Sequence, residues 1–331
     1  MSRIRIADIA RACDVSASTV MRCVHQNGYV SEENRKKIEE TIQKSGYLPN
    51  RAAQGLRRKD ANMIGCVVPL SFPNTFFLRV ENAIEDAVTR HNFRFLSLTC
   101  NGQEANEKAI TREFLSNMVS GIVFVSPCSR KHVEEVLKFD VPVVVIERDY
   151  GNLNVNRILF DDATSTELAI NHFVKNNHKN IGFIGVNSEH KVEKDRIDGY
   201  KKCVQKNGLS LSLTNVHLVN DFTLENGYAA TKAIFENGKP PTALFIASDL
   251  LACGALQYFY EKRIRIPDDV SVIGYDNSYS AFTSPALTTV AVPFDEVGDR
   301  IARIFNRPKD EPAENYTIQP MLIERQSVKK L

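Results

Sequence analysis

The chain has 331 residues, enough for two or three domains with separate hydrophobic cores. Hydrophobic residues make up 43% and charged residues 25%, and no apolar run approaches the roughly 20 residues of a membrane-spanning helix, which excludes an integral membrane protein. Residues 1–60 contain twelve Lys and Arg against seven Asp and Glu, a formal charge of +5, whereas the whole chain carries +2. A basic head on a mildly acidic body indicates a phosphate-binding module joined to a body that does not bind nucleic acid.

Two short amphipathic stretches within residues 6–24 predict a helix-turn-helix. Their apolar positions are Ile6, Ile9 and Ala10, and then Val15, Val20 and Val24. Ser16 lies in the polar break between them and has the hydroxyl that an N-cap requires. A helix that begins there presents Ala17, Ser18 and Arg22 outward, as a recognition helix does in a DNA major groove. A plain three-helix bundle with incidental surface residues is the alternative.

A second DNA-reading element is expected after a third helix at about 32–44. Asn50 can cap a new helix that runs to about residue 59 and contains Gly55. A helix of one or two turns with an interior Gly is marginal in water, so we expect it to form only when something holds it. Its exposed Leu56 beside Arg57 suits a wedge pushed between base steps of a minor groove, with the cations on phosphates.

From residue 63 onward, short apolar runs alternate with helical stretches. The expected strands are 63–68, 93–98, 121–125, 141–146, 181–184, 216–219, 243–246 and 270–273, and the expected helices are 75–91, 105–117, 164–176, 195–207, 224–237 and 250–262. Near-continuous apolar strands between helices indicate parallel sheets covered on both faces. The strands are too many for one comfortable sheet, and a break near residues 160–162 divides them into two halves. Ligands of such sheets bind beyond the carboxyl ends of the strands, so we expect a site in the cleft between the two.

Polar and aromatic side chains just past the expected strand ends are the candidate ligand contacts: Phe76, Phe77, Glu147, Arg148, Phe222, Ser248 and Asp276, with Arg196 at the start of a helix. Aromatic faces with fixed charged groups match a polyhydroxy ligand. Two carboxylates and two guanidinium groups predict a nearly neutral site. Other interpretations stay open: both Phe residues can belong to the core, although we expect at least one of them in the cleft. Arg196 and Asp276 can form an ordinary ion pair, and Asp249 is expected to cap a helix.

These residues together resemble the lactose/galactose repressor family (LacI–GalR type) of bacterial transcriptional regulators. The head matches at Ile6–Ala10, Val15–Ser16, Thr19–Val20, Arg22, Val30–Ser31, Gly46–Tyr47, Pro49–Ala53 and Gly55–Leu56. The body matches at Gly182–Gly185, Arg196, Gly199–Tyr200, Ser248–Asp249, Pro267–Asn277 and Pro285–Val290, among others. A single matching segment can arise by chance, whereas the whole set of segments in the same order is not expected by chance.

The resemblance implies an all-α helix-turn-helix head on an α/β body like that of periplasmic binding proteins. It implies a DNA-binding domain at 1–48, a hinge helix and linker at 49–61, and an effector-binding and dimerisation domain at 62–331. The chain would cross three times between two doubly wound subdomains, about 62–160 with 292–322 and about 161–291 with 323–331. The implied DNA contacts are Ser16, Ala17, Ser18, Thr19, Arg22, Asn50, Arg51, Ala53, Leu56 and Arg57.

For the cleft, the resemblance makes Arg148, Arg196, Phe222 and Asp276 effector contacts. Four residues depart from the usual pattern of the family. Ser248 replaces a frequent Asn and Val292 a frequent Gln, and in the head Met21 and His25 stand where Ser and Asn are usual. These departures put the effector and the operator sequence in doubt, and not the class of protein.

The leading prediction is a transcriptional repressor that binds a pseudo-palindromic DNA operator as a homodimer under the control of a small-molecule effector, a sugar or sugar derivative. No leucine heptad follows at the end of the chain, which favours a dimer over a tetramer. Alternatives are a solute-binding protein, a regulator with a corepressor or a non-sugar effector, and an enzyme with a Rossmann-like domain. Against an enzyme, no G-x-G-x-x-G, P-loop or G-x-S-x-G lies at a suitable strand end.

The sequence predicts no metal and no bound cofactor. Seven cysteines are scattered without a CxxC motif or a nearby His pair, and are expected to be reduced thiols. The cationic N-terminus has no apolar signal core, which predicts a cytoplasmic, nucleoid-associated protein with no membrane partner.

Overall fold

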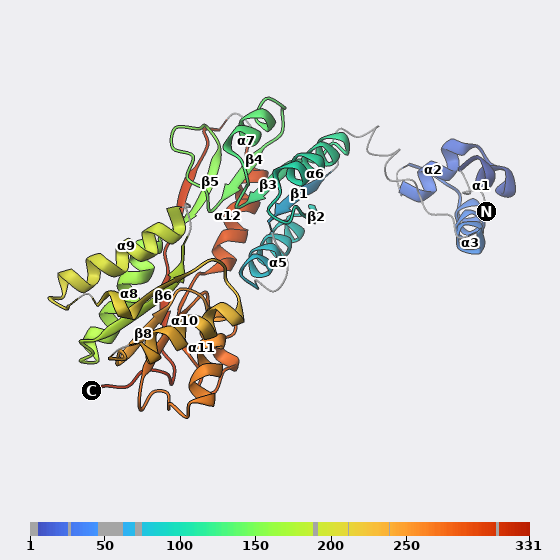
Figure 1. Ribbon diagram of the computed structural model, residues 1–331. Coiled ribbons are helices and arrows are strands. Elements are labelled where there is room, and N and C mark those ends of the chain that lie inside the picture. The colour runs from blue at the N-terminus through green and yellow to red at the C-terminus, as the bar shows by residue number, and fades with distance from the viewer. Residues whose placement is uncertain are drawn as a thin grey trace. The chain divides into compact units, whose positions relative to one another are not determined.

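The computed structural model describes residues 6–25, 28–45, 62–69, 75–187, 191–210, 212–237, 239–308 and 311–331. The chain divides into two compact units, Met1–Ala61 and Asn62–Leu331, called here the head and the body (Figure 1). Over the described ranges, no helix is both long enough and apolar enough to cross a membrane.

The described part of the head is a three-helix unit formed by α1 (Ile6–Cys13), α2 (Ala17–His25) and α3 (Glu32–Ser45). Ile9, Val20 and Ile38 are fully buried at its centre, one from each helix. The predicted apolar positions of α1 and α2 all belong to this core or pack against it. The predicted hinge at 49–61, with Asn50, Arg51, Ala53, Leu56 and Arg57, lies outside the described residues and stays a prediction.

The first sheet of the body is entirely parallel. It has the order β11-β5-β4-β3-β1-β2, formed by β1 (Met63–Val68), β2 (Arg94–Thr99), β3 (Gly121–Val125), β4 (Val143–Ile146), β5 (Asn156–Phe160) and β11 (Asn315–Ile318). Every residue of β3 and of β4 is buried, since helices cover both faces of the sheet. These helices are α5 (Thr75–Arg90), α6 (Glu104–Ser116), α7 (Arg130–Val136) and α12 (Phe294–Asn306).

The second sheet has the order β12-β10-β9-β8-β6-β7. Its strands are β6 (Ile181–Val186), β7 (Val216–Val219), β8 (Ala243–Ile246), β9 (Ser271–Tyr275), β10 (Thr288–Ala291) and β12 (Met321–Ile323), of which only β12 runs antiparallel to its neighbour. The helices that pack with it are α8 (Asp162–Lys175), α9 (Lys191–Lys206), α10 (Leu224–Glu236) and α11 (Asp249–Glu261). The two sheets and their helices are called here the first and second subdomains.

The chain passes three times between the subdomains: from β5 to α8, from β10 to α12, and from β11 to β12. The expected fold class, two parallel-dominated sheets behind a helical head, is therefore confirmed. The eight expected strands are present to within a few residues. The strands β5, β10, β11 and β12 and the helices α7 and α12 were not predicted. The strands β11 and β12 are short edge strands, β10 has only four residues and α7 only seven, whereas α12 is a 13-residue amphipathic helix that was overlooked in the sequence.

Helices α10 and α11 approach each other closely because a glycine of each lies at their crossing. A Cβ atom on Gly254 would lie 2.0 Å from the carbonyl oxygen of Leu224, and one on Gly227 would lie 2.0 Å from that of Leu251. A clash with backbone cannot be relieved by rotating a side chain, so neither position has room for a larger residue.

Replacing Gly254 should therefore reverse the usual effect of Gly→Ala. In an ordinary helix interior this change stabilises by about 1 kcal/mol. Here Gly254→Ala should lower the free energy of unfolding by about 1–3 kcal/mol, the cost of overpacking. Urea unfolding measures it, with Gln257→Ala on the exposed face of the same helix as the control. A variant as stable as the wild type would contradict the packing described.

Candidate functional site

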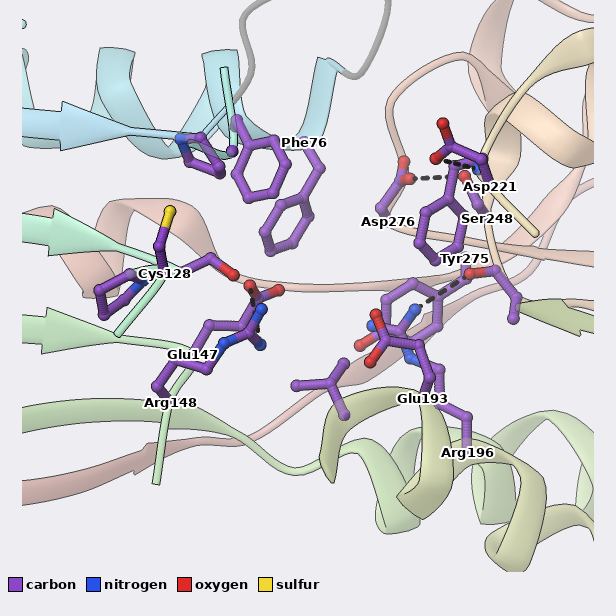
Figure 2. A pocket seen from close by; sticks show the side chains of 18 residues that line it. Phe76, Cys128, Glu147, Arg148, Glu193, Arg196, Asp221, Ser248, Tyr275 and Asp276 are labelled. Carbon is purple, nitrogen blue, oxygen red and sulfur yellow. Dashed lines mark hydrogen bonds and ion pairs between the residues drawn. The ribbon is translucent and has the colours of Figure 1, made fainter. Parts of the chain in front are cut away.

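A cavity of about 340 Å³ lies between the two subdomains of the body (Figure 2). Its walls come from the carboxyl ends of β1, β2, β3, β4, β7, β8 and β9 and from the first turns of α5 and α9. The lining residues are Pro69, Phe76, Phe77, Gly102, Ser126, Pro127, Cys128, Glu147 and Arg148 on the first subdomain, and Val192, Glu193, Arg196, Asp221, Phe222, Ala247, Ser248, Tyr275 and Asp276 on the second. Its volume lies within the range of about 300–1,000 Å³ typical of small-molecule sites.

A buried cation is fixed at the wall of the second subdomain. Nε of Arg196 donates to Oδ1 of Asp162 at 2.7 Å, and one terminal nitrogen donates to the carbonyl oxygen of Ala247 at 3.1 Å. The guanidinium carbon lies 3.9 Å from the ring centroid of Tyr275, whose hydroxyl donates to the same oxygen of Asp162. Although burial opposes its charge, the adjacent Asp162 raises the pKa of Arg196 above its usual value. The guanidinium is therefore charged and held in one orientation.

Asp276, on the same wall, lies beside a second buried carboxylate. Asp249 accepts three backbone N–H groups of residues 278–280 at 2.9–3.2 Å and the hydroxyl of Thr289 at 2.9 Å. Asp276 accepts the N–H of Ser278 at 2.9 Å and is 5% exposed. Burial, together with the neighbouring Asp249, raises the pKa of Asp276 to about 8. We therefore assign the proton to Asp276, because Asp249 has more donors to stabilise its anion.

The wall of the first subdomain carries Glu147 and Arg148 directly after β4. Nη1 of Arg148 lies 3.8 Å from Oε2 of Glu147. Burial raises the pKa of Glu147, and the charge of Arg148 opposes this shift. Nε of Arg148 is buried without a hydrogen-bond partner among the described residues, and the same holds for one carboxylate oxygen of Glu193 across the cavity. Figure 2 shows these two residues on opposite sides of the empty space. Buried polar atoms in this condition are expected to bond to a ligand or to water.

Aromatic rings line both walls of the cavity. Phe76 and Phe77 meet edge to face at 5.5 Å, and Phe76 packs in the same way on Phe160 and Phe294 of the core. Phe222 faces the cavity from the loop after β7. Phe76 therefore belongs to the core and to the wall at once, and the alternative that both rings lie in the core away from the cleft is wrong.

All eight predicted effector residues line this one cavity: Phe76, Phe77, Glu147, Arg148, Arg196, Phe222, Ser248 and Asp276. Their roles in binding stay predictions. The alternative ion pair between Arg196 and Asp276 is wrong, because the partner of Arg196 is Asp162. Asp249 does not cap α11: that cap is Ser248, which accepts the N–H of Leu250. Val292 is buried in the core and does not line the cavity.

Four important residues were not found from the sequence: Asp162, Glu193, Asp221 and Tyr275. Asp162 follows a strand that was itself missed, and Tyr275 reads as one more apolar strand residue. With Glu193 and Asp221, the lining contains four carboxyl groups against two guanidinium groups. The predicted count of two carboxylates and two guanidinium groups is therefore incomplete. With Asp276 protonated, three carboxylates line the cavity against two guanidinium groups, which gives it a slight acidic bias.

In the head, α2 begins as predicted. The Oγ of Ser16 accepts the N–H of Thr19 at 3.1 Å, which caps the helix. Ser16, Ala17, Ser18 and Arg22 are exposed and Thr19 is half-buried, so this face of α2 is open to a partner. The prediction of an exposed face on a capped helix is confirmed, and contact with bases stays a prediction.

Comparison with known proteins gives one consistent result. The family described as "Bacterial regulatory proteins, lacI family" matches residues 5–50, and "Periplasmic binding protein-like domain" matches residues 170–328. Catabolite control protein A of Priestia megaterium is 30% identical over 332 residues, covering 98% of this chain and 99% of that protein. The chain belongs to the LacI family. It is a DNA-binding transcriptional regulator and not an enzyme.

A further relative agrees with this family, and a solved structure has the same fold. The ribose operon repressor of Haemophilus influenzae is 28% identical over 330 residues, covering 98% of each chain. A crystal structure of the lac repressor dimer bound to operator and the anti-inducer ONPF matches with a TM-score of 0.85 and 23% identity, covering 99% of this chain and 100% of that one. The LacI-family head excludes the alternatives of a transport solute-binding protein, a Rossmann-like enzyme and a plain helical bundle.

The raised pKa of Asp276 predicts that stability falls as pH rises. Its pKa in the folded protein is about 8 against a usual value of 3.8, so between these values the folded state binds the extra proton. The free energy of unfolding should therefore fall with rising pH, by up to about 1.4 kcal/mol per pH unit. Urea unfolding between about pH 5 and 8 checks this, with Asp276→Asn as a permanently neutral control. An equal pH dependence of the two proteins would contradict the assignment.

Proposed function

We propose that this LacI-family regulator responds to an uncharged polyhydroxy compound, a sugar or sugar derivative, bound in the cavity between the subdomains. The observation that carries the proposal is the fixed guanidinium of Arg196 opposite Arg148, whose Nε has no hydrogen-bond partner among the described residues, in a cavity bordered by aromatic rings. Hydroxyl groups both donate and accept, so they suit a wall that combines guanidinium donors with carboxylate acceptors. Ring faces of Phe77 and Phe222 complement the C–H faces of a sugar.

The acidic bias of the cavity supports a neutral ligand over an anionic one. The carboxylates of Glu147, Glu193 and Asp221 face the cavity, while Asp276 is protonated and neutral. Of the two arginines of the cavity, Arg196 is already paired with Asp162. A phosphate or carboxylate ligand would approach these acidic groups at short range. In a partly buried site, like-charge contacts of this kind cost binding free energy.

A thermal-shift screen of neutral sugars, sugar phosphates and sugar acids tests the ligand class. A neutral sugar at one hundred times its Kd should stabilise the protein by about 2.7 kcal/mol, and its phosphate ester by much less. Calorimetry should then show no binding of that sugar to Asp276→Ala and unchanged binding to Asp268→Ala, a surface control. Binding retained in Asp276→Ala, or stabilisation by the phosphate ester alone, would remove this assignment.

We also propose that the protein acts as a homodimer on a pseudo-palindromic operator. Two heads related by a two-fold axis require two inverted half-sites, and the similar lac repressor was solved as a dimer on its operator. The hinge residues Asn50, Arg51, Ala53, Leu56 and Arg57 would bind the minor groove. Because its operator is chromosomal DNA, we place the protein in the cytoplasm, at the nucleoid.

The exposed face of α2 should read bases through Arg22, with Ser16, Ala17, Ser18 and Thr19 placing the helix in the groove. An arginine that binds guanine with two hydrogen bonds contributes about 1–3 kcal/mol of discrimination. Arg22→Ala should therefore weaken operator binding. It should also reduce the difference in binding free energy between the operator and DNA with a single-base change. Lys36 is an exposed cation on α3, and Lys36→Ala should leave that difference in binding free energy unchanged. Anisotropy titrations measure both, and an equal loss on every DNA would reduce Arg22 to a phosphate contact.

Two contacts between the subdomains offer a physical route from the cavity to the operator. Arg79 of α5 donates to the carbonyl oxygen of Asp276 at 2.9 Å, and Nζ of Lys191 lies 3.8 Å from Asp149. A ligand that hydrogen-bonds to Asp276 therefore acts on a residue whose carbonyl oxygen already joins both subdomains through Arg79. We propose that the angle between the subdomains is the two-state element that both ligand and operator bias. The direction of the response, induction or corepression, follows from operator titrations with and without ligand.

A further inference from the structure

Cys100, Glu107 and Cys128 form a compact cluster of possible metal ligands at the edge of the first subdomain. Cys100 follows β2, Cys128 lies in the loop after β3, and Glu107 is on the first turn of α6. The strands β2 and β3 flank β1, so the cluster draws together loops from the same carboxyl edge of the sheet that forms the cavity. One ligand atom of each residue lies within 4.8 Å of the other two.

Glu107 is an unusual residue for this position. Its side chain is 1% exposed, although the helix that carries it has an exposed face. One carboxylate oxygen accepts the backbone N–H of Cys128 at 2.8 Å, while the other is buried without a hydrogen-bond partner among the described residues. Burying a carboxylate oxygen without a partner is costly, so such an oxygen points to a bound cation or water.

We propose that Cys100, Cys128 and Glu107 bind one thiophilic divalent cation of the zinc class. Two thiolates and a carboxylate are ligands that this class prefers, and three protein ligands leave a fourth tetrahedral position open. With metal–sulfur bonds of about 2.3 Å, the ligand atoms of such a site lie roughly 3.3–3.8 Å apart. The cluster therefore needs to contract by only about 1 Å, and the exposed side chain of Cys128 has room to rotate toward the other two ligands.

The site would lie beside the effector cavity, because Cys128 is also one of the lining residues (Figure 2). The open position of the cation would then be accessible to a ligand hydroxyl or to water. Binding would release the two thiol protons, so the ion with its three anionic ligands would carry the same charge of −1 as the two thiols and the carboxylate before binding. The ion would tie the loops after β2 and β3 to α6. This proposal does not depend on the identity of the effector, since the three ligands come from one subdomain.

Titration of the full-length protein with Co²⁺ in the presence of a phosphine reductant tests the proposal. We expect one Co²⁺ per chain, with the visible d–d bands of a tetrahedral site and a thiolate-to-metal charge-transfer band, both removed by added Zn²⁺. Cys128→Ser should weaken binding at least about tenfold and lower the charge-transfer band, because even residues outside the ligand set change metal affinity by that much. Glu107→Gln should weaken binding while retaining the charge-transfer band of two thiolates.

Cys253→Ser is the matched control, since Cys253 is a free cysteine of α11 outside the cluster and should leave the spectrum unchanged. Circular dichroism confirms that each variant is folded. Absence of a tetrahedral cobalt spectrum, or a spectrum that survives Cys128→Ser, would overturn the proposal. It would also be overturned if the reduced protein bound no metal and the cluster instead oxidised to a disulfide between Cys100 and Cys128 in air.

Discussion

The ion pair between Arg196 and Asp162 is the interaction on which the effector cavity depends. Its 2.7 Å contact is almost fully buried and joins the second turn of α9 to the first residue of α8, with the ring of Tyr275 against the guanidinium. Leaving either charge buried without the other would cost several kcal/mol, so the pair fixes both helices at the end of the sheet. The sheet thereby presents a preformed cation to the cavity, and a ligand does not have to order it.

The other side chains of the cavity are also positioned by the fold before a ligand binds. Parallel strands deliver their carboxyl ends to one edge, so short loops after β4, β8 and β9 bring Glu147, Ser248 and Asp276 to one place without long excursions of the chain. Because each subdomain supplies one wall, the cavity changes shape whenever the subdomains move. Acidic groups outnumber basic ones along these walls, and burial keeps Asp276 protonated near neutral pH, so the cavity combines donors and acceptors without a strong net charge.

The sequence predicted the parts of the structure that leave a local signal. The helical spacing of apolar residues and a cap residue located α2, and apolar runs such as 121–125 located the central strands. Most of the predicted cavity residues follow strands or lie at the start of a helix, where position alone implies a role. Arg196 was expected at the start of a helix but lies in the second turn of α9, which begins at Lys191. Asp162 and Tyr275 could not be found in this way, because their importance comes from Arg196, which is distant in sequence and meets them only in the fold. The cluster at Cys100, Glu107 and Cys128 was missed for the same reason: its spacing in the sequence resembles no metal motif.

The central claim is that the charge of Arg196, held by Asp162, recognises the ligand. Calorimetric titration of a sugar that binds, into the wild type and into the double variant Asp162→Asn with Arg196→Gln, tests it most directly. Both replacement side chains are neutral, so the double variant leaves no buried charge without its partner and should fold. A hydrogen bond to a charged group contributes about 1.5–3 kcal/mol, so the affinity should fall by roughly 10- to 150-fold. An unchanged affinity in a folded double variant would contradict the claim.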